Sequence, residues 1–316
     1  MRLYHSDASA TIISKMTINI RNYTPAELDA YVQLVNEIDA VDKLGKATSV
    51  EYLKERLGQP GYHSVEDIFL AELDGLLVGY AEIVRELEIG RVILDGAVHP
   101  AYRGRGVGIR LLEGTLYHSK ELGAEVFQIP IAQRMQASQH FARKRGLMVV
   151  RRQWLMSLTK YRETVLQIPH GFQHRPFLPG DEEKLCAIQN LAFAGSWGFR
   201  PNTVGEIRYL VNTSLCHYEG ILFITEDEKV VSYCWTIDKP TGEDKGYIRM
   251  MGVDPSYRGQ GLGRAVLVAG INYLQHRGMK AIEIAVDSEN LTAKRLYQSV
   301  GFKRRGVILW YEKRLS

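Results

Sequence analysis

Cysteine is scarce in this sequence. The 316 residues include only three cysteines, at positions 186, 216 and 234, without the spacing of a metal-binding cluster. An odd and sparse set of thiols does not provide a disulfide framework, and it fits a reducing compartment. The sequence therefore predicts a cytoplasmic protein without a metal site.

Long apolar runs and an excess of one charge are also missing. No window reaches the roughly 18 apolar residues of a membrane helix, and no signal peptide is recognisable at the start. The net charge is only +4, from 40 Lys and Arg against 36 Asp and Glu, and no basic arm stands out. These absences argue against a membrane or a nucleic acid as a partner. The hydrophobic share of 45% is enough for sizeable cores.

The sequence does contain an internal repeat. Residues 98–108 and 253–263 align without a gap at a constant offset and share the pattern Val-x-Pro-x-Tyr-Arg-Gly-x-Gly-x-Gly. Further glycines keep the same offset, so each copy is far longer than a solenoid unit and predicts a domain of its own. We expect domains at 16–161 and 171–316, joined by a linker near 162–173.

Both copies predict the same order of elements, from hydrophobic periodicity and turn residues. In the first copy we expect strands at 17–22, 68–73, 77–83 and 91–98 and helices at 26–38 and 50–57. In the second copy we expect strands at 171–177, 221–225, 230–237, 247–253, 281–286 and 302–311 and helices at 181–193, 204–211 and 291–300. The predicted class is α/β, with a mixed, mostly antiparallel twisted sheet flanked by helices in each domain.

A glycine-rich segment lies between the fourth strand and the next helix of each copy, at 103–108 and 258–263. Backbone N–H groups at a helix N-terminus form a site for a pyrophosphate, and glycine permits the left-handed backbone and the close approach of phosphate oxygens. A dinucleotide fingerprint would follow the first strand with a different spacing. An ordinary tight turn between strand and helix remains the alternative.

A second pattern begins at Asn290. Together with Ala293 and Tyr297 it follows i, i+3, i+7 spacing, so the three residues share one helix face, while Leu296 and Val300 lie on another face toward the sheet. Asn290 can be a helix N-cap and Tyr297 a residue at the edge of the core. A tyrosine hydroxyl can also donate a proton in catalysis, and both interpretations can hold together.

The two patterns together resemble the GNAT acetyltransferase superfamily. Residues 253–264 are similar to its acyl-coenzyme A motif, and residues 290–302 match its Asn-x-x-Ala-x-x-Leu-Tyr-x-x-x-Gly-Phe block at every marked position. The resemblance covers nearly the whole chain. The tandem arrangement and the helical segment 190–200 also resemble the mycothiol synthase family.

This resemblance implies an N-acetyltransferase that uses acetyl-CoA. It implies that Tyr297 is the general acid for the departing thiolate, that Asn290 contacts the coenzyme or the substrate, and that the Val253 backbone N–H stabilises the developing oxyanion. The coenzyme would be bound by Val253, Arg258, Gly259, Gln260, Gly261, Leu262, Gly263, Arg264, Asn290, Ala293 and Tyr297, with Arg103, Gly104, Arg105, Gly106, Val107 and Gly108 as the matching set of the first copy.

The acceptor is less clear from the residues. The strand at 247–253 has no glutamate to serve as a base, and a lysine-like amine with a pKa near 10.4 would then cost roughly 4 kcal/mol to deprotonate, whereas an α-amino group would cost far less. We therefore expect a small-molecule amine. A protein N-terminus, a lysine side chain or a non-catalytic acyl-CoA sensor are the alternatives. Trp197, Phe199 and Arg200 are candidates for the acceptor groove, or for an aromatic hinge.

The first copy departs from the family pattern. At the constant offset, Ala142 stands in place of Tyr297 and Met135 in place of Asn290. The glycine loop is kept but the proton donor is lost, so we expect phosphate binding at most and no acetyl transfer. Basic residues within 143–152 can meet the coenzyme 3′-phosphate or simply form a solvated face.

Overall fold

A computed structural model describes residues 17–160, 165–238 and 244–315. Position 16 and part of the expected linker lie outside the described residues. The elements of the N-terminal half are β1 (Ile18–Asn22), α1 (Leu28–Asp42), α2 (Val50–Leu57), α3 (Ser64–Asp67), β2 (Ile68–Leu73), β3 (Leu76–Glu86), β4 (Arg91–Val98), α4 (Val107–Glu121), β5 (Val126–Ala132), α5 (Gln136–Lys144) and β6 (Met148–Leu158). The elements of the C-terminal half are β7 (Gln173–Pro176), α6 (Glu182–Phe193), α7 (Val204–Val211), β8 (Ile221–Glu226), β9 (Lys229–Asp238), β10 (Lys245–Val253), α8 (Leu262–His276), β11 (Ala281–Asp287), α9 (Leu291–Ser299) and β12 (Lys303–Arg314).

The predicted elements are present in the predicted order. The expected helices at 50–57 and 204–211 coincide with α2 and α7, and the expected strands at 68–73 and 91–98 coincide with β2 and β4. The other predicted ends differ by a few residues, where helix and strand termini are least defined by sequence. The predicted mixed α/β fold, with helices flanking a mostly antiparallel sheet, is confirmed.

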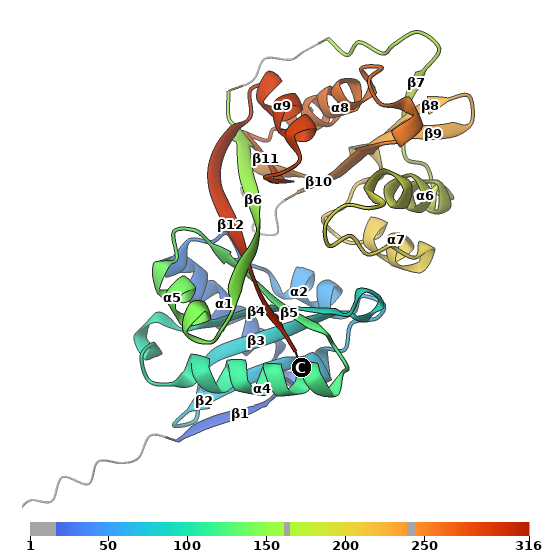
Figure 1. Ribbon diagram of the computed structural model, residues 1–316. Coiled ribbons are helices and arrows are strands. Elements are labelled where there is room, and N and C mark those ends of the chain that lie inside the picture. The colour runs from blue at the N-terminus through green and yellow to red at the C-terminus, as the bar shows by residue number, and fades with distance from the viewer. Residues whose placement is uncertain (1–16, 161–164, 239–243, 316) are drawn as a thin grey trace, which may run out of the picture.

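The twelve strands of the described residues form one sheet, in the order β1-β2-β3-β4-β5-β12-β6-β11-β10-β9-β8-β7. The C-terminal strand β12 pairs with β5 of the N-terminal half, through residues 308–314 and 126–132. In return, β6 pairs with β11 of the C-terminal half, and β6 and β12 also pair with each other. Figure 1 shows these two long strands running between the halves, with the C-terminus in the N-terminal half. The two halves therefore exchange their last strands.

This exchange differs from the sequence-based expectation that the strand at 302–311 would close its own half. The two last strands end equivalent units of a repeat, so each can pair with the neighbouring strand of either half. A local hydrophobic pattern cannot distinguish these two pairings, because the strand meets a similar neighbour in both.

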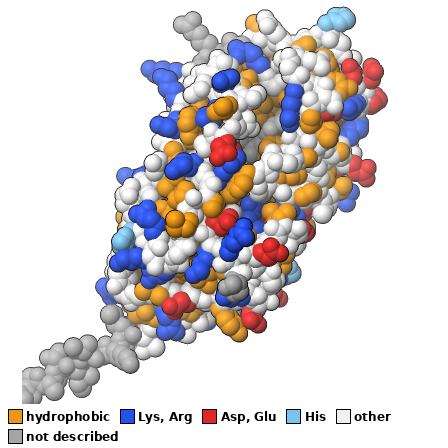
Figure 2. All heavy atoms as spheres, in the orientation of Figure 1, with side chains coloured by type: hydrophobic (Ala, Val, Ile, Leu, Met, Phe, Trp, Pro, Cys, Tyr) orange, Lys and Arg blue, Asp and Glu red, His pale blue; other side chains and the backbone are white. Residues whose placement is uncertain are grey.

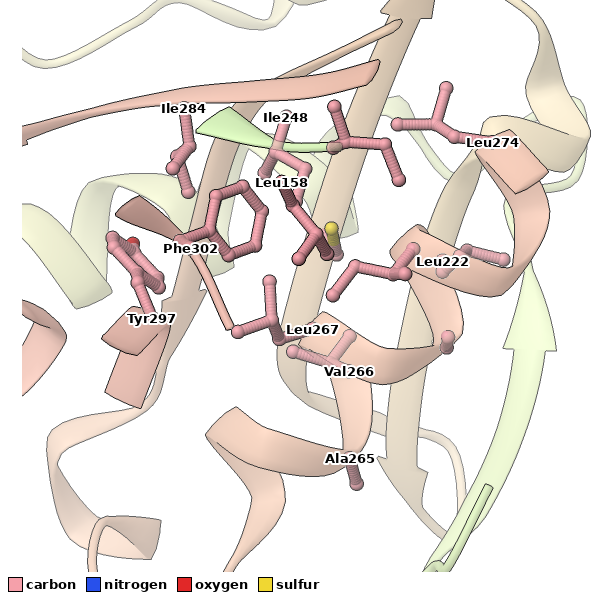
Figure 3. Packing of buried hydrophobic residues seen from close by; sticks show 14 of the residues in the cluster. Leu158, Leu222, Ile248, Ala265, Val266, Leu267, Leu274, Ile284, Tyr297 and Phe302 are labelled. Atoms are coloured by element: carbon pink, nitrogen blue, oxygen red, sulfur yellow. The ribbon is translucent and has the colours of Figure 1, made fainter. Parts of the chain in front are cut away.

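Helices cover both faces of the sheet. In each half, one apolar cluster lies under the helix that follows the glycine loop, and a second lies under the first two helices. Figure 3 shows the cluster under α8, where Val266, Leu267 and Leu274 project toward Ile248 of β10. Burying each such side chain contributes roughly 1.5–3 kcal/mol relative to exposure. This cluster fixes α8, and hence the glycine loop at its start, against the sheet.

The surface carries no large field of one charge on the face drawn in Figure 2, where basic and acidic side chains are interspersed. Among the described residues, no helix is long and apolar enough to cross a bilayer.

Candidate active site

The glycine loop of the C-terminal half joins β10 to α8. Gly259 and Gly261 have φ of +82° and +83°, in the left-handed region that favours glycine. Gly261 is the N-cap of α8, so the first N–H groups of that helix have no intrahelical acceptor. Within the described residues, the N–H groups of 259–263 have no backbone or side-chain acceptor either. The loop therefore fits a pyrophosphate, which would accept from these donors at the positive end of the helix.

Three side chains of this segment have partners within the protein. The Arg258 guanidinium donates to the Ala192 carbonyl at 2.9 Å, and the Arg264 guanidinium donates to Ser299 Oγ at 2.9 Å. Leu262 is buried in the cluster under α8. The backbone N–H groups of this segment are therefore the donors available to a phosphate. Arg258 attaches the loop to the end of α6.

Gly263 brings two predicted site segments together. A Cβ at this position would lie 3.4 Å from Val253 Cγ2 and 3.5 Å from Leu296 Cδ2. The glycine thus lets the first turn of α8 lie between the end of β10 and the helix α9, which carries Tyr297. Val253 and Leu296, which are 43 positions apart in the sequence, meet at this one backbone position.

An opening in the sheet lies beside Val253. The parallel pairing of β10 with β11 ends at Ile248 and Ile284, although β10 continues to Val253. The Asp254 N–H donates to the Val231 carbonyl (2.9 Å), and the Gly252 carbonyl accepts from Ser232 Oγ (3.0 Å), both toward β9. Consecutive N–H groups of an extended strand point to opposite edges, so the Val253 N–H points away from β9, into the opening.

Tyr297 is the buried residue of α9. Its side chain is 6% exposed and packs against Phe302, with ring centroids 6.0 Å apart. Burial raises the pKa of the Tyr297 hydroxyl well above its ordinary value. Among the described residues this hydroxyl has no hydrogen-bond partner, so its proton is free for a ligand. Figure 3 shows the ring at the margin of the cluster, with its oxygen at the end of the side chain.

The helix faces of α9 differ in part from the prediction. Ala293, Leu296 and Val300 all pack against the same cluster as Tyr297, so Leu296 and Val300 share its face instead of lying on another. The spacing i, i+3, i+4, i+7 places these four residues on one apolar stripe. Asn290 is the N-cap: its Oδ1 accepts from the Ala293 N–H at 3.0 Å, as the simpler interpretation predicted.

The segment between α6 and α7 carries the three candidate acceptor residues. Phe199 stacks on Phe193, with centroids 6.0 Å apart, and Trp197 is 37% exposed. Arg200 donates to Glu206 at 2.5 Å, and Glu206 also caps α7. Burial is the largest influence on the Glu206 carboxyl and would raise its pKa, but the hydrogen bonds from Arg200 and Thr203, together with the charge of Arg200, leave that pKa lowered. The Arg200 guanidinium thus has a carboxylate partner inside the protein.

Carboxylates near the opening come from β11 and not from β10. Asp287 ends β11 beyond the last pairing with β10, and Glu289 follows it. Both accept from Arg151 of β6, Asp287 at 2.7 Å and 2.9 Å. Sequence reasoning missed this group because only the exchange of strands brings β6 to β11. On β10 itself, Arg249 occupies an irregularity in the pairing with β9, and its guanidinium lies over Trp235.

The glycine loop of the N-terminal half repeats this backbone geometry. Gly104 and Gly106 have φ of +77° and +89°, and Gly106 is the N-cap of α4. Arg103 donates to Asp42 at the end of α1 and to the Val98 carbonyl, so it attaches the loop to the first helix. Arg105 instead lies over the ring of Tyr102, and Val107 is buried. The backbone cradle is therefore present in both halves.

The proton donor is absent from the N-terminal half. Ala142, at the position of Tyr297, is fully buried in the core cluster under α4, and Met135 begins α5 without a side-chain cap. The basic residues within 143–152 include three arginines with protein partners. Arg143 donates to Tyr311 Oη at 3.1 Å, Arg145 lies over Phe141, and Arg151 bonds the carboxylates described above.

This geometry can be compared with known proteins. The model of the "Acetyltransferase (GNAT) family" matches the chain twice, over residues 39–147 and 183–302. The two matches cover most of the chain and contain both glycine loops. The chain belongs to the GNAT acetyltransferase family.

This acetyltransferase is similar to proteins named "Mycothiol acetyltransferase". It is 30% identical to that of Thermobispora bispora over 318 residues, which covers 94% of this chain and 100% of the relative. It is 30% identical to that of Acidothermus cellulolyticus over 259 residues, which covers 75% and 76%. The sequence-based expectations of the family, of an acetyltransferase and of acetyl-CoA as the acetyl donor are thereby confirmed.

Two solved structures have the same fold as this acetyltransferase. A GCN5-related N-acetyltransferase from Sphaerobacter thermophilus has a TM-score of 0.76 at 23% identity, and the match covers 94% of this chain and 96% of that one. A tandem GNAT protein from the clavulanic acid biosynthesis pathway has a TM-score of 0.75 at 14% identity, and the match covers 95% and 99%. At these identities the likeness concerns the fold alone.

Proposed function

We propose that this enzyme acetylates the primary amine of a small molecule at the site of the C-terminal half, with Tyr297 as general acid. The observation that carries this proposal is the buried Tyr297 hydroxyl, which has no hydrogen-bond partner among the described residues and lies on α9, next to Leu296, which meets Val253 at Gly263. A hydroxyl with a raised pKa stays protonated at working pH and can give its proton to a departing thiolate.

The chain supplies the other parts from its backbone. Acetyl-CoA, when bound, provides the acetyl group as a thioester. The N–H groups of 259–263 would hold its pyrophosphate, and the Val253 N–H would donate where negative charge develops on the acyl oxygen. Asn290 caps α9 through the Ala293 N–H, and the small Ala293 side chain would leave room for the coenzyme beside Tyr297.

The acceptor follows from the missing base. The described part of β10 carries no carboxylate, so an amine that is partly neutral at working pH reacts with the least cost. An α-amino group has this property and a lysine side chain does not. The similarity to proteins named for mycothiol supports a small-molecule acceptor of this kind.

A panel of amines tests this proposal. Protein is mixed with acetyl-CoA and with glycinamide, glucosamine, a peptide with a free N-terminus or a lysine-containing peptide, and thiol release is followed. We expect release with a small amine and not with the peptides. Preference for a peptide N-terminus or lysine would replace the small-molecule acceptor, and no release with any amine, despite bound coenzyme, would favour a non-catalytic sensor.

A further inference from the structure

The C-terminal site and the N-terminal half meet at a contact between Arg91 and Gly198. Arg91 begins β4 and is only 7% exposed. Its Nη2 donates to the Gly198 carbonyl at 2.7 Å, while its Nε donates to Glu86 at 2.6 Å and its Nη1 to Gln128 at 3.3 Å. Glu86 and Gln128 thus hold the Arg91 side chain within its own half. Its Nη2 is fixed as a donor to the segment between α6 and α7.

Gly198 is shaped for this contact. Its φ of +64° lies in the left-handed region. A Cβ at this position would overlap Arg91 Nη1 and lie 3.1 Å from its Cζ. Both the backbone conformation and the space therefore require glycine where the guanidinium approaches.

The neighbouring Trp197 is held by the same surface. Two guanidinium groups lie over its ring, with Arg91 Cζ at 5.8 Å and Arg151 Cζ at 5.6 Å from the centroid. It also packs edge-on against Trp310 of β12, with centroids 5.5 Å apart. Cations over an aromatic face and an edge-to-face pair both add to the apolar contact. Residues of strands β4, β6 and β12 therefore fix a residue that follows α6.

The other end of this segment contacts the glycine loop and the end of β10. The Ala192 carbonyl accepts from Arg258 of the glycine loop, and a Cβ on Gly252 would lie 2.6 Å from the Ala192 side chain. Phe193 and Phe199 stack within the same segment. Residues 192–200 thus run from the residue before Val253 to the surface of the N-terminal half, and they include the three candidate acceptor residues.

We propose that Arg91 is a positioning residue for the acceptor side of the C-terminal site. It would act through the Gly198 carbonyl and the Trp197 ring, without touching the reacting atoms. This role rests on the proposed function. The N-terminal half would determine the affinity for the acceptor, while the C-terminal half binds the coenzyme.

Steady-state kinetics of Arg91→Gln test this role, with the acceptor from the amine panel that the wild type acetylates. We expect the KM for that acceptor to rise about tenfold, since the charge-assisted hydrogen bond to the Gly198 carbonyl is lost, while the KM for acetyl-CoA changes less than about twofold. The matched control is Arg85→Gln, which removes another arginine of the N-terminal half that is bonded to a buried carboxylate, Asp67, away from this segment. An unchanged acceptor KM in Arg91→Gln, or the same rise in Arg85→Gln, overturns the proposal.

Hydrogen–deuterium exchange provides a readout without turnover. Arg91→Gln should speed exchange in peptides covering 194–201 and leave peptides covering 259–263 unchanged. Gly198→Ala alone should raise the KM for the acceptor. The same substitution should raise it by less when Arg91→Ala is also present, because the added Cβ then no longer overlaps the Arg91 guanidinium. Unchanged exchange at 194–201, or equal effects of Gly198→Ala in both backgrounds, overturns the positioning role. Failure of the proposed function is a separate result, seen as no thiol release by the wild type.

Discussion

The rings of Tyr297 and Phe302 pack against each other with centroids 6.0 Å apart, at the edge of the cluster under α8. Phe302 holds the tyrosine in place whether or not its hydroxyl is present, because the ring contacts do not involve the oxygen. Tyrosine and phenylalanine are therefore interchangeable here for packing, and a substitution separates packing from proton transfer.

Tyr297→Phe should lower turnover by about 10²–10⁴, the range for a lost general acid, with little change in coenzyme A affinity. The measurement is steady-state thiol release together with calorimetric titration of coenzyme A. Near-normal turnover in this variant across the working pH range would remove Tyr297 from the mechanism.

The pH dependence should have a single ascending limb. Burial raises the pKa of Tyr297, so the acid stays protonated up to at least about pH 10 and no activity is lost on its account at high pH. The ascending limb of kcat/KM should follow the pKa of the acceptor amine, because the described part of β10 has no carboxylate base. Profiles for two acceptors of different amine pKa check this: the midpoint should move with the acceptor. A fixed midpoint, or a descending limb below about pH 9, would contradict the assignment.

Gly261→Val should abolish turnover without unfolding the protein, since a side chain would obstruct the cradle of N–H groups at the start of α8. Gly278→Val is the matched control, because Gly278 also has positive φ (+81°) but lies in an open turn after α8. Gly106→Val tests the loop of the N-terminal half, and we expect turnover to persist. If Gly106→Val loses turnover as completely as Gly261→Val while it stays folded, the N-terminal half is a working site.

Arg56→Met should destabilise the N-terminal half by about 3–5 kcal/mol, because it leaves a buried carboxylate without its cation. Glu82 is 1% exposed and accepts from Arg56 at 2.7 Å and from Tyr31 Oη at 3.0 Å. Lys46→Met breaks the partly exposed pair with Asp95 nearby and should cost no more than about 1 kcal/mol. Urea unfolding of both variants measures the two free energies. Equal losses would mean that burial of Glu82 does not control the stability of this half.

The family, the order of the elements and the two glycine loops were readable in the sequence, because each depends on residues close together along the chain. The left-handed backbone at Gly259 and Gly261 depends on the glycines themselves, and the cap at Asn290 depends on a hydrogen bond to a residue three positions away. The absence of a proton donor at Ala142 follows from the repeat alone. The residue roles proposed from these motifs stay predictions until the variants are measured.

Only the tertiary structure decided where the last strands go and what the segment 192–200 contacts. The exchange of β6 and β12 pairs equivalent strands, so no local pattern distinguishes it from two separate sheets. Arg91 and Gly198 are 107 positions apart, and neither belongs to a glycine loop or to the block at 290–302. Their contact depends on the docking of one half on the other, which is set by surfaces that the exchange of strands brings together. Hydrophobic period and turn chemistry specify elements, whereas contacts between the halves arise from the packing of the assembled sheet.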